Sequence, residues 1–326
     1  MIIITGGLGF IGSNLANHLA KKKNIYLVDW IEKNKLNNII LRLHKKIILP
    51  ENFIEFLKLN QRNIEIIIHM GAITSTTETN ADKIIKNNIE LSEFIWNWCF
   101  VNKKRLIYAS SAATYGNGEY GFYDHENLAY LRKLEPLNLY GWSKHSFDKY
   151  VLNKIKIQTK LPQWVGLKFF NVYGPNEFHK KNMRSIVCKI YEKVKNKNKV
   201  ELFKSHNINF EDGEQLRDFI YVKDVVDVIS WFIENKLVNG IYNLGTGKPR
   251  SFNSVAEQVF INCNQEKKIF FIPTPRTIRE QYQYFTEANM KKLRNAGYTK
   301  KFFSLEDGIS DYIQNFLIKT KYDLHS

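Results

Sequence analysis

A tyrosine and a lysine stand four residues apart in the segment Tyr140-Gly141-Trp142-Ser143-Lys144. Residues at this spacing lie on one face of a helix, so a phenol and an ammonium group would be neighbours there. A nearby cation favours the phenolate and lowers the pKa of the tyrosine toward that of a useful base. The spacing alone proves little, because a chain with 17 tyrosines and many lysines contains such pairs by chance.

A second chemical feature is the serine pair Ser110-Ser111, which directly follows the apolar run from Arg105 to Ala109. In an open parallel sheet, ligands collect at the carboxyl ends of the strands, so a hydroxyl placed there can converge on the same site as Tyr140. The alternative is that these serines only cap the following turn. Together the two features favour proton-transfer chemistry at one site.

A third feature is a glycine-spaced turn, with Gly6, Gly9 and Gly12 following the apolar run Ile2 to Thr5. Such a turn at the start of a helix lets backbone amides and the positive helix end approach a pyrophosphate. Asp29 closes the next apolar run, where a carboxylate reaches the ribose of a dinucleotide. The segment therefore predicts binding of a nicotinamide dinucleotide.

The choice between NAD and NADP stays open at this level. The carboxylate of Asp29 favours NAD because it repels a 2′-phosphate. Lys33 and Lys35 follow closely, however, and a pair of ammonium groups could neutralise that phosphate.

The elements that must position these residues are strands alternating with helices, as in βαβ units around a parallel sheet. Helices are expected to begin near Gly12, Asn80 and Leu139. The expected strands are Ile2 to Thr5, Ile25 to Val28, Ile64 to His69, Arg105 to Ala109 and Gln163 to Phe169.

This pattern predicts an α/β fold, a Rossmann-like doubly wound parallel sheet with a smaller, less regular C-terminal substrate domain. The dinucleotide-binding domain is expected over residues 1–170, with a return segment near 218–245. Residues 171–326 are then mainly the substrate-binding domain, because turn signals such as Gly174-Pro175 and Gly245-Thr246-Gly247 break the pattern there. The polar stretch from 207 to 215 is expected to be a surface loop.

The formal charge of +16 raises the question of nucleic-acid binding. The lysines are scattered, with only short runs such as 21–23, and no nucleic-acid-binding motif accompanies them. We therefore expect no nucleic-acid partner, although a basic field helps to attract a diphosphate ligand.

Targeting and metal signals are also missing from the sequence. No apolar run reaches the 18 residues needed to span a bilayer, and the chain opens on MIIITGGLGF rather than on a signal peptide, which predicts a cytoplasmic protein with no membrane association. Cys99, Cys188 and Cys263 lack the close spacing of a zinc site, so we expect no metal and structural thiols in a reducing compartment.

Several segments carry a resemblance to a known family. TGGLGFIG, YASSAATYG, YGWSK, FFNVYGP and RDFIYVKDV resemble the extended short-chain dehydrogenases that modify sugar nucleotides, the NAD-dependent epimerase/dehydratase family, nearly end to end. Within it, HMGAITSTTE, PLNLYGWSK, FNVYGPNEFHKKNM, IYNLGTG and QYFTEANMKKLRNAGY are most similar to the branch that inverts C6 of an ADP-activated heptose for the lipopolysaccharide inner core. The resemblance implies an isomerase that keeps NADP, or NAD, bound and forms homo-oligomers, with pentamers as the family's habit.

The resemblance also implies roles for individual residues. Tyr140 and Lys144 become the catalytic pair, Ser111 binds the reacting hydroxyl, and Lys180 becomes a second acid/base group. Inverting a secondary alcohol makes two such groups reasonable, because hydride leaves one face of C6 and returns to the other. Without the family, Lys180 is one lysine among many in a basic loop.

The implied binding sites are larger sets drawn from several segments. The implied cofactor site consists of Gly6, Gly9, Phe10, Ile11, Gly12, Asp29, Trp30, Lys35, Met70, Gly71, Ala72, Ile73, Thr74, Asn87, Lys144, Val172 and Lys180. The implied substrate site consists of Ser111, Asn171, Asn182, Lys189, Phe203, Arg217 and Tyr282. The planar fork of Arg217 suits a diphosphate, and the alternative is an ion pair with Asp218.

The sequence departs from the family's pattern at four places. Near Pro50 the family has a lysine that helps to hold the cofactor, and none aligns with it here; Asn182 replaces a usual serine. Trp30 replaces a common asparagine, and the loop from 207 to 215 is longer than the family's. NADP remains the expected cofactor, with NAD as the alternative.

Three rival functions share part of this pattern. A sugar-nucleotide 4,6-dehydratase needs an acidic pair just after the serine, where this chain has Ala112-Ala113. A hexose 4-epimerase shares Ser111, Tyr140 and Lys144 but has no need of Lys180. A non-catalytic dinucleotide-binding protein commonly loses the tyrosine or the lysine, and this chain has both.

Overall fold

The computed structural model describes residues 1–31, 43, 46–157, 162–197, 199–279 and 282–319. Lys33 and Lys35, two residues of the expected cofactor region, lie outside this described part. No helix within it is both long enough and apolar enough to cross a membrane.

The centre of the molecule is a seven-stranded parallel sheet with the order β11-β6-β5-β4-β1-β2-β3. Its strands are short, almost wholly buried and rich in isoleucine, valine and leucine, as expected of strands covered on both faces. They span Ile2–Thr5 (β1), Ile25–Val28 (β2), Ile47–Ile48 (β3), Ile66–His69 (β4), Arg105–Ser111 (β5), Trp164–Phe169 (β6) and Gly240–Leu244 (β11).

The direction of winding reverses between β1 and β4. From β1 the chain proceeds to β2 and β3 on one side, whereas β4, β5, β6 and β11 follow on the other. Ligands of open parallel sheets bind outside the carboxyl ends of the strands at such a reversal. The turn after Thr5 and the segment after His69 meet at this point, because the two strands pair residue for residue from Ile2 and Ile66 onward.

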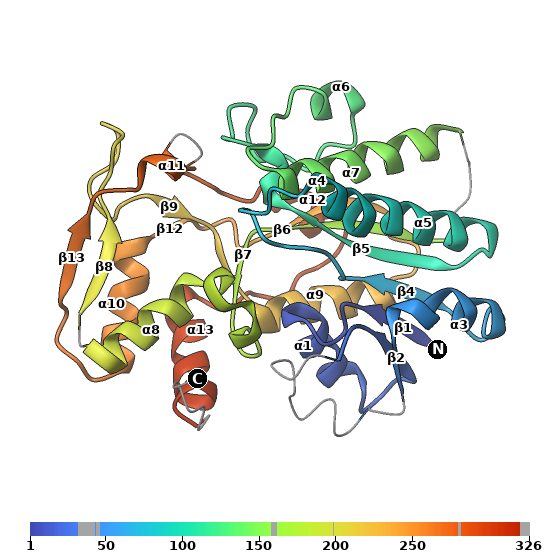
Figure 1. Cartoon of the computed structure of the whole chain (residues 1–326), viewed down its shortest axis with the longest axis horizontal. Helices are drawn as coiled ribbons and strands as arrows, with labels where there is room; N and C mark the ends of the chain where they lie inside the picture. Colours follow the sequence, from blue (N-terminus) through green and yellow to red (C-terminus); the bar gives the residue numbers. More distant parts are fainter. Residues whose placement is uncertain (32–42, 44–45, 158–161, 198, 280–281, 320–326) are drawn as a thin grey trace.

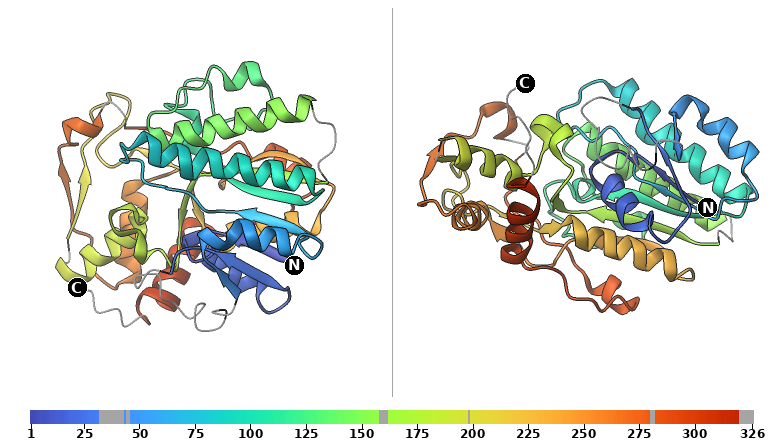
Figure 2. Two further views of the ribbon diagram at one scale, coloured as in Figure 1. Left: turned by 45° about the vertical axis from the view of Figure 1, so that its right-hand side comes forward. Right: turned by 90° about the horizontal axis from the view of Figure 1, so that it is seen from below.

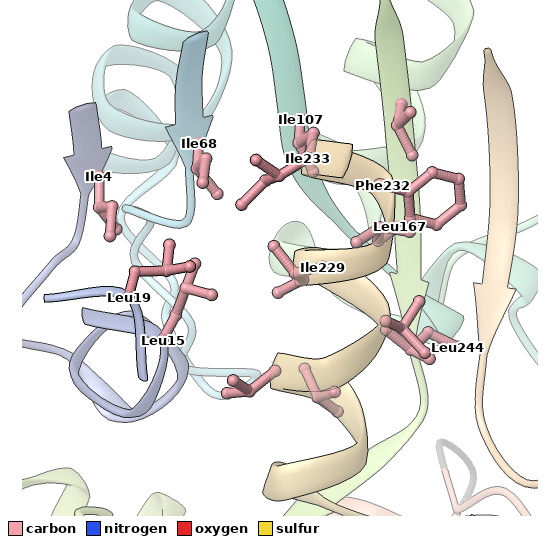
Figure 3. Close-up of a cluster of buried hydrophobic side chains, with 14 of the residues drawn as sticks. Ile4, Leu15, Leu19, Ile68, Ile107, Leu167, Ile229, Phe232, Ile233 and Leu244 are labelled. Carbon is pink, nitrogen blue, oxygen red and sulfur yellow. The ribbon is translucent and has the colours of Figure 1, made fainter. Parts of the chain in front are cut away.

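Two helices cover one face of the sheet, α1 (Phe10–Leu19) and α9 (Val222–Glu234). Figure 3 shows the apolar side chains between them and the strands, with Leu15 and Leu19 of α1 beside Ile4 and Ile68. Ile229, Phe232 and Ile233 of α9 pack toward Ile107, Leu167 and Leu244. This core anchors α1, whose first residue borders the glycine turn.

The opposite face is covered by helices α3, α5 and α7, seen in Figure 1 with α5 and α7 side by side above the strands. The helical elements on this side are η3 (Pro50–Asn52), α3 (Phe53–Leu59), α4 (Ala81–Ile84), η4 (Ile85–Glu90), α5 (Leu91–Val101), η5 (Ala112–Tyr115), α6 (Leu128–Leu131) and α7 (Leu139–Ile157). Asn80 caps α4 by accepting a hydrogen bond from Lys83 N at 2.9 Å, which is why the chain becomes helical there.

A smaller region lies at one end of the sheet, on the left in Figure 1 and in both views of Figure 2. Its core is a separate apolar cluster formed mainly by α8, α10, α13 and the strands beside them. The elements are β7 (Asn171–Tyr173), η6 (Phe178–Met183), α8 (Ile186–Lys197), β8 (Val200–Phe203), β9 (Leu216–Arg217), β10 (Phe219–Tyr221), β12 (Arg250–Ser251), α10 (Phe252–Asn262), β13 (Ile269–Ile272), α11 (Arg276–Arg279), α13 (Leu305–Tyr312) and η7 (Ile313–Leu317). The short helix α12 (Lys291–Asn295) instead packs beside β11, with Leu293 in the same apolar core as α1 and α9.

The strands of this smaller region form three two-stranded pairs, β7 with β10, β8 with β13, and β9 with β12. Only the last pair is antiparallel. Short pairs of this kind do not make a continuous sheet, which is why the repeating apolar pattern of the first 170 residues fades here.

The fold class expected from the sequence is confirmed. Four of the five expected strands begin within one residue of their observed start, and the remaining one begins at Ile66 rather than at Ile64. The domain boundary at residue 170 stays a prediction. β11 and α9 lie within or just after the expected return segment and belong to the central sheet and its cover.

Candidate active site

The glycine turn has the backbone that close approach requires. Gly6 has φ +64°, and a Cβ on it would lie 2.7 Å from Gly71 Cα, so only glycine fits between the ends of β1 and β4. Gly12 is equally constrained, because its Cβ would lie 2.1 Å from Gly6 O. These two glycines let α1 begin directly against the turn.

Gly9 differs, because the chain around it does not demand a glycine. Its φ is −71°, and a Cβ there would come within 3.4 Å of one atom only, Gly6 O at 3.1 Å. It is the N-cap of α1, and no side-chain hydrogen bond caps that helix end. A Cβ at Gly9 would therefore occupy space beside the positive end of α1, where a pyrophosphate binds. A dinucleotide fits this turn.

Asp29 completes the rim of the turn. Its Oδ2 accepts a hydrogen bond from Leu8 N at 2.9 Å, and its Oδ1 accepts one from Trp30 N at 2.9 Å. The carboxylate thus ties the end of β2 to the glycine turn, while the Trp30 side chain beside it is half exposed. This placement agrees with a ribose contact and leaves the choice between NAD and NADP undecided.

His69 links the two strand ends through a chain of hydrogen bonds. Gly71 N donates to Thr5 Oγ1 at 3.2 Å, and Thr5 Oγ1 lies 2.6 Å from His69 Nδ1. On the other side, His69 Nε2 lies 2.9 Å from Ser92 Oγ, which donates to Asn88 O at 2.6 Å. Each hydrogen-bond donor in this chain of hydrogen bonds has an acceptor when the neutral imidazole carries its proton on Nε2. Thr5 Oγ1 then donates to His69 Nδ1, and His69 Nε2 donates to Ser92 Oγ.

Burial keeps that ring neutral. Burial, together with the nearby Lys144 cation, lowers the pKa of His69 to about 3. A neutral imidazole that accepts at one nitrogen and donates at the other is a fixed spacer between the two strand ends. We infer no proton-transfer role for it.

The segment after β4 is held by Asn88, a residue that the sequence did not single out, whereas a cofactor contact of its neighbour Asn87 stays a prediction. Asn88 is fully buried; its Oδ1 accepts from Ile73 N at 2.8 Å and its Nδ2 donates to Ile73 O at 2.9 Å and to Ser143 Oγ at 3.0 Å. Asn87 bonds back to Lys83 O within its own helix. Sequence reasoning missed Asn88 because adjacent asparagines look alike without the facing direction of the helix.

The segment that Asn88 holds is open to a ligand. Met70, Gly71, Ala72 and Ile73 are partly buried, and Thr74 is exposed. They follow β4 at the reversal point, beside the glycine turn.

Tyr140 and Ser111 meet where α7 contacts the turn η5. A Cβ on Gly141 would lie 2.7 Å from Ala113 O, so glycine at this position allows helix and turn to approach closely. The Ser111 side chain accepts a hydrogen bond from Ala113 N at 3.1 Å, so it caps the turn as well as facing Tyr140. Burial raises the pKa of Tyr140, and the hydrogen bond with Ser111 opposes that rise.

Lys144 is one helical turn further along α7, as the spacing predicts. Its side chain is 3% exposed, and burial lowers the pKa of its ammonium to about 8, with the negative charge of Asp148 opposing the shift. A lysine that titrates near neutrality can exchange a proton with a neighbouring phenol.

Asp148 belongs to a buried polar network beneath the site. It forms an ion pair with Lys168 at 2.6 Å, in which both side chains are fully buried. Asp148 also accepts hydrogen bonds from Ser110 Oγ at 2.7 Å and Tyr108 Oη at 3.1 Å. Lys168 donates further to Thr114 Oγ1 at 2.7 Å. The network fastens α7 to β5, β6 and η5, the elements that carry Ser111 and Tyr140.

Lys180 reaches this end of the sheet from the smaller region. Its Nζ lies 5.3 Å from the centre of the Phe10 ring, at the first residue of α1. Burial lowers the pKa of Lys180, Glu177 raises it, and Lys189 lowers it further. Asn14 of α1 donates a hydrogen bond to Pro175 O at 2.9 Å, which ties the same loop to the helix.

Arg217 is a buried guanidinium between two aromatic rings. Its Cζ lies 5.4 Å from the Tyr282 ring centre and 5.7 Å from that of Phe252, and burial lowers its pKa to about 10. The expected alternative, an ion pair with Asp218, is wrong. Asp218 instead accepts hydrogen bonds from the backbone N–H groups of Thr246, Gly247 and Ala288, at 2.7 to 2.9 Å.

No ion pair of Arg217 is found in the described part of the chain, where its guanidinium donates to the carbonyls of Leu216 and Gln283. A buried cation without a counter-charge favours an anionic ligand. The Phe203 and Tyr282 rings lie 6.3 Å apart, so the expected substrate residues Phe203, Arg217 and Tyr282 come together.

Four expected ligand residues lie on the segment between Asn171 and Lys189. Asn171 is exposed at the start of β7, Val172 is partly buried, Asn182 is exposed in η6, and Lys189 is partly buried on α8. Lys189 acts electrostatically on Lys180.

Comparison with known proteins follows this geometry. The model of the NAD dependent epimerase/dehydratase family matches residues 2–245, a span that contains the glycine turn, Ser111, Tyr140, Lys144 and Lys180. The chain belongs to this family. The matched span includes the point between β1 and β4 where the winding reverses, the glycine turn after β1 and the end of β5 at Ser111.

Individual members of the family are also similar. The ADP-L-glycero-D-manno-heptose-6-epimerase of Fusobacterium nucleatum is 47% identical, over 98% of this chain and 98% of that protein. The crystal structure of the Helicobacter pylori ADP-L-glycero-D-manno-heptose-6-epimerase superposes with a TM-score of 0.77 at 29% identity, covering 96% of this chain and 95% of that one.

A family member of known cofactor content shows the same fold. The Thermus thermophilus UDP-glucose 4-epimerase, solved in complex with NAD, has a TM-score of 0.75 at 20% identity and covers 98% of this chain and 99% of that one. At this identity the likeness concerns the fold alone.

Proposed function

We propose that the chain is a 6-epimerase that converts ADP-D-glycero-β-D-manno-heptose to ADP-L-glycero-β-D-manno-heptose, the heptose donor of the lipopolysaccharide inner core. The observation that carries the proposal is the position of Lys180, which the structure brings from the smaller region to Phe10, beside the glycine turn. Inversion of a secondary alcohol can use an acid/base group on each face of the reacting carbon, and Lys180 would be the second such group.

The cofactor of this proposal is NADP, held by the glycine turn, Asp29 and the segment from Met70 to Thr74. Bound there, the cofactor would supply reversible hydride transfer at C6. NAD is the alternative, which the negative charge of the Asp29 carboxylate favours, although both of its oxygens already accept backbone hydrogen bonds. Identifying the dinucleotide released on denaturation separates the two.

Tyr140, Ser111 and Lys144 serve the first face. Ser111 holds the reacting hydroxyl, and Tyr140 Oη takes or gives its proton. Burial raises the pKa of Tyr140, so it needs help to act as a base; the neighbouring Lys144 cation, with its own pKa lowered to about 8, can provide that help.

Lys180 serves the second face. The ketone formed at C6 turns over, and the oxygen that faced Tyr140 then faces Lys180. Burial lowers the pKa of this lysine, which makes proton exchange near neutral pH easier than for an exposed ammonium. The substrate's diphosphate is held by the guanidinium of Arg217.

The rival chemistries make different demands. A dehydratase needs a carboxylate beside Ser111, and the turn η5 that follows contains only Ala112, Ala113, Thr114 and Tyr115. A hexose 4-epimerase has no use for a second acid/base group, so the placement of Lys180 favours the 6-epimerase.

The test is to incubate the purified protein with ADP-D-glycero-β-D-manno-heptose without added cofactor and to follow C6 inversion by proton NMR. UDP-glucose, offered in parallel, tests the 4-epimerase reading. Inversion of the heptose alone supports the proposal, and inversion of the hexose alone overturns it. Light scattering of the same sample tests the homo-oligomer, pentameric by resemblance, that belongs to this proposal.

A further inference from the structure

Glu177 is a fully buried carboxylate in the loop that carries Lys180. Its Oε1 accepts hydrogen bonds from Gly174 N at 3.3 Å and from Ser185 Oγ at 2.7 Å. Its Oε2 accepts one from Ser185 N. Because Gly174 and Ser185 lie at the two ends of the loop, one carboxylate closes the loop from inside.

The same carboxylate fastens the loop to the rest of the smaller region. Tyr312 Oη of α13 donates to Glu177 Oε1 at 3.2 Å. On the opposite side, Asn14 holds Pro175 to α1. The loop is therefore fixed between the helix that begins at the glycine turn and a helix near the C-terminus.

The backbone beside Lys180 needs such a restraint. Lys181 has φ 49° and ψ −120°, a conformation that favours glycine and is strained for a residue with a side chain. A strained conformation persists when the surrounding contacts determine it. The contacts of Glu177 at both ends of the loop provide that determination.

We propose that Glu177 is a positioning residue for the reaction, which holds Lys180 against Phe10 at the reacting face and keeps its ammonium protonated at the right stage. This role rests on the function proposed above. Its electrostatic part follows from charge signs, because a carboxylate near an ammonium favours the protonated form. Glu177 raises the pKa of Lys180, whereas burial and Lys189 lower it.

Several other titratable groups lie near Glu177 and Lys180 and contribute to the pKa values of these two residues. Burial raises the pKa of Glu177, which hydrogen bonds from Ser185 and the charge of Lys180 oppose. Other described titratable groups that interact with Glu177 include Arg184 in the loop, Cys188 and Lys189 on α8, and Tyr312 on α13.

The first experiment measures Lys180 directly and needs no turnover. Trace acetylation of the full-length protein over a range of pH, read by mass spectrometry, gives the pH at which the Lys180 amine becomes half reactive. In Glu177→Gln, which keeps the shape of the side chain and removes its charge, this midpoint should fall. Glu257→Gln is the matched control, because Glu257 on α10 pairs with the exposed Lys267 and should leave the Lys180 midpoint unchanged.

The second experiment measures epimerisation. Glu177→Gln should lower kcat by at least about 10-fold while dinucleotide content stays that of the wild type. The limb of the pH profile that disappears in Lys180→Met should move to lower pH. Ser185→Ala keeps the charge and removes one donor at 2.7 Å, so it should lower kcat less and leave the limb in place.

Two results would overturn the role of Glu177. One is an unchanged acetylation midpoint in Glu177→Gln. The other is a loss of kcat that is uniform at every pH, as general destabilisation produces. If Glu177→Gln does not fold, Ser185→Ala with wild-type kcat overturns it instead. Failure of the 6-epimerase function appears separately, as a wild-type protein that does not invert the heptose while its acetylation midpoint still responds to Glu177.

Discussion

Lys144, which is buried, and Lys180, which is partly buried, are placed by different means. Lys144 is on the 19-residue helix α7 and is fastened by the Asp148–Lys168 network beneath it. Lys180 is on the six-residue turn η6 and depends on a single carboxylate for the shape of its loop. Burial lowers the pKa of both lysines, and a carboxylate opposes the shift in each case.

The difference shows how far regular secondary structure alone can position the side chains of a site. In α7, the helical repeat puts Tyr140, Lys144 and Asp148 on one face whatever else surrounds them. In η6, no helical repeat orients Lys180. Its position depends instead on the buried carboxylate of Glu177 and on the strained backbone of Lys181. We expect the position of Lys144 to tolerate the loss of a contact in the η6 loop. The position of Lys180 should be sensitive to the same loss.

The largest expected effect is that of Tyr140→Phe. It should cut epimerisation by at least about 100-fold, because a general acid/base group contributes about 10² to 10⁴ in rate. Fold and cofactor binding should remain, as circular dichroism and released dinucleotide report. Tyr150→Phe on the same helix, whose hydroxyl bonds Asn97 at 2.9 Å, is the control and should keep full activity. Near-normal turnover in Tyr140→Phe would make the tyrosine–lysine spacing accidental.

The next effect is on the free energy of unfolding, through the buried Asp148–Lys168 ion pair beneath Lys144. Lys168→Met leaves the Asp148 carboxylate buried without its cation, which should cost about 3 to 5 kcal/mol in the free energy of unfolding. Urea denaturation followed by fluorescence measures this. Lys156→Met, an exposed site on α7, should change the free energy by less than about 0.5 kcal/mol. Equal stabilities of the two variants would show that the network does not fasten α7.

Substitution of Lys180 should lower turnover of the complete epimerisation but leave the redox step on the Tyr140 side intact. Lys180→Met should lower epimerisation by about 100-fold, yet retain oxidation or reduction of an aldehyde-bearing analogue in the orientation that Tyr140 serves. Lys181→Met, at the exposed neighbouring position, is the control. Heptose inversion at the wild-type rate in Lys180→Met would refute the two-base mechanism, and Tyr140 would then act on both faces.

The smallest effect is a pH dependence of stability in the sheet region. Burial lowers the pKa of His69 to about 3, so between pH 6 and 5 the unfolded chain binds a proton at this position and the folded chain does not. The free energy of unfolding should therefore fall as the pH falls, by about 1.4 kcal/mol per pH unit from this residue. Urea titrations at both pH values should show a shallower fall in His69→Asn. The same slope in both proteins would contradict the assignment.

Local features of the molecule could be predicted from the sequence. The strand ranges, the glycine turn, Asp29 closing β2 and the Tyr140–Lys144 pair all follow from short repeats or fixed spacings. Such features depend on neighbours within a few residues, which a single sequence displays. They predicted the fold class and one side of the site.

Other features depended on which distant segments meet. Arg217 was expected either to bind a diphosphate or to pair with Asp218, and the structure removes the pairing by turning Asp218 toward three backbone N–H groups of other segments. Asn88 holds the segment after β4 from inside, and only the direction in which the helix faces distinguishes it from its neighbour Asn87. Spacing cannot reveal either outcome.

The sequence by itself determined the parallel sheet, the dinucleotide turn and the helical face that bears Tyr140 and Lys144, because hydrophobic periodicity and backbone geometry are local properties. Only the tertiary structure decided that Lys168 would pair with Asp148, that Lys180 would lie against Phe10, and that Glu177 would close the loop between Gly174 and Ser185. These contacts exist because burial makes an unpaired charge or donor costly, so the packed chain joins partners that the sequence keeps apart.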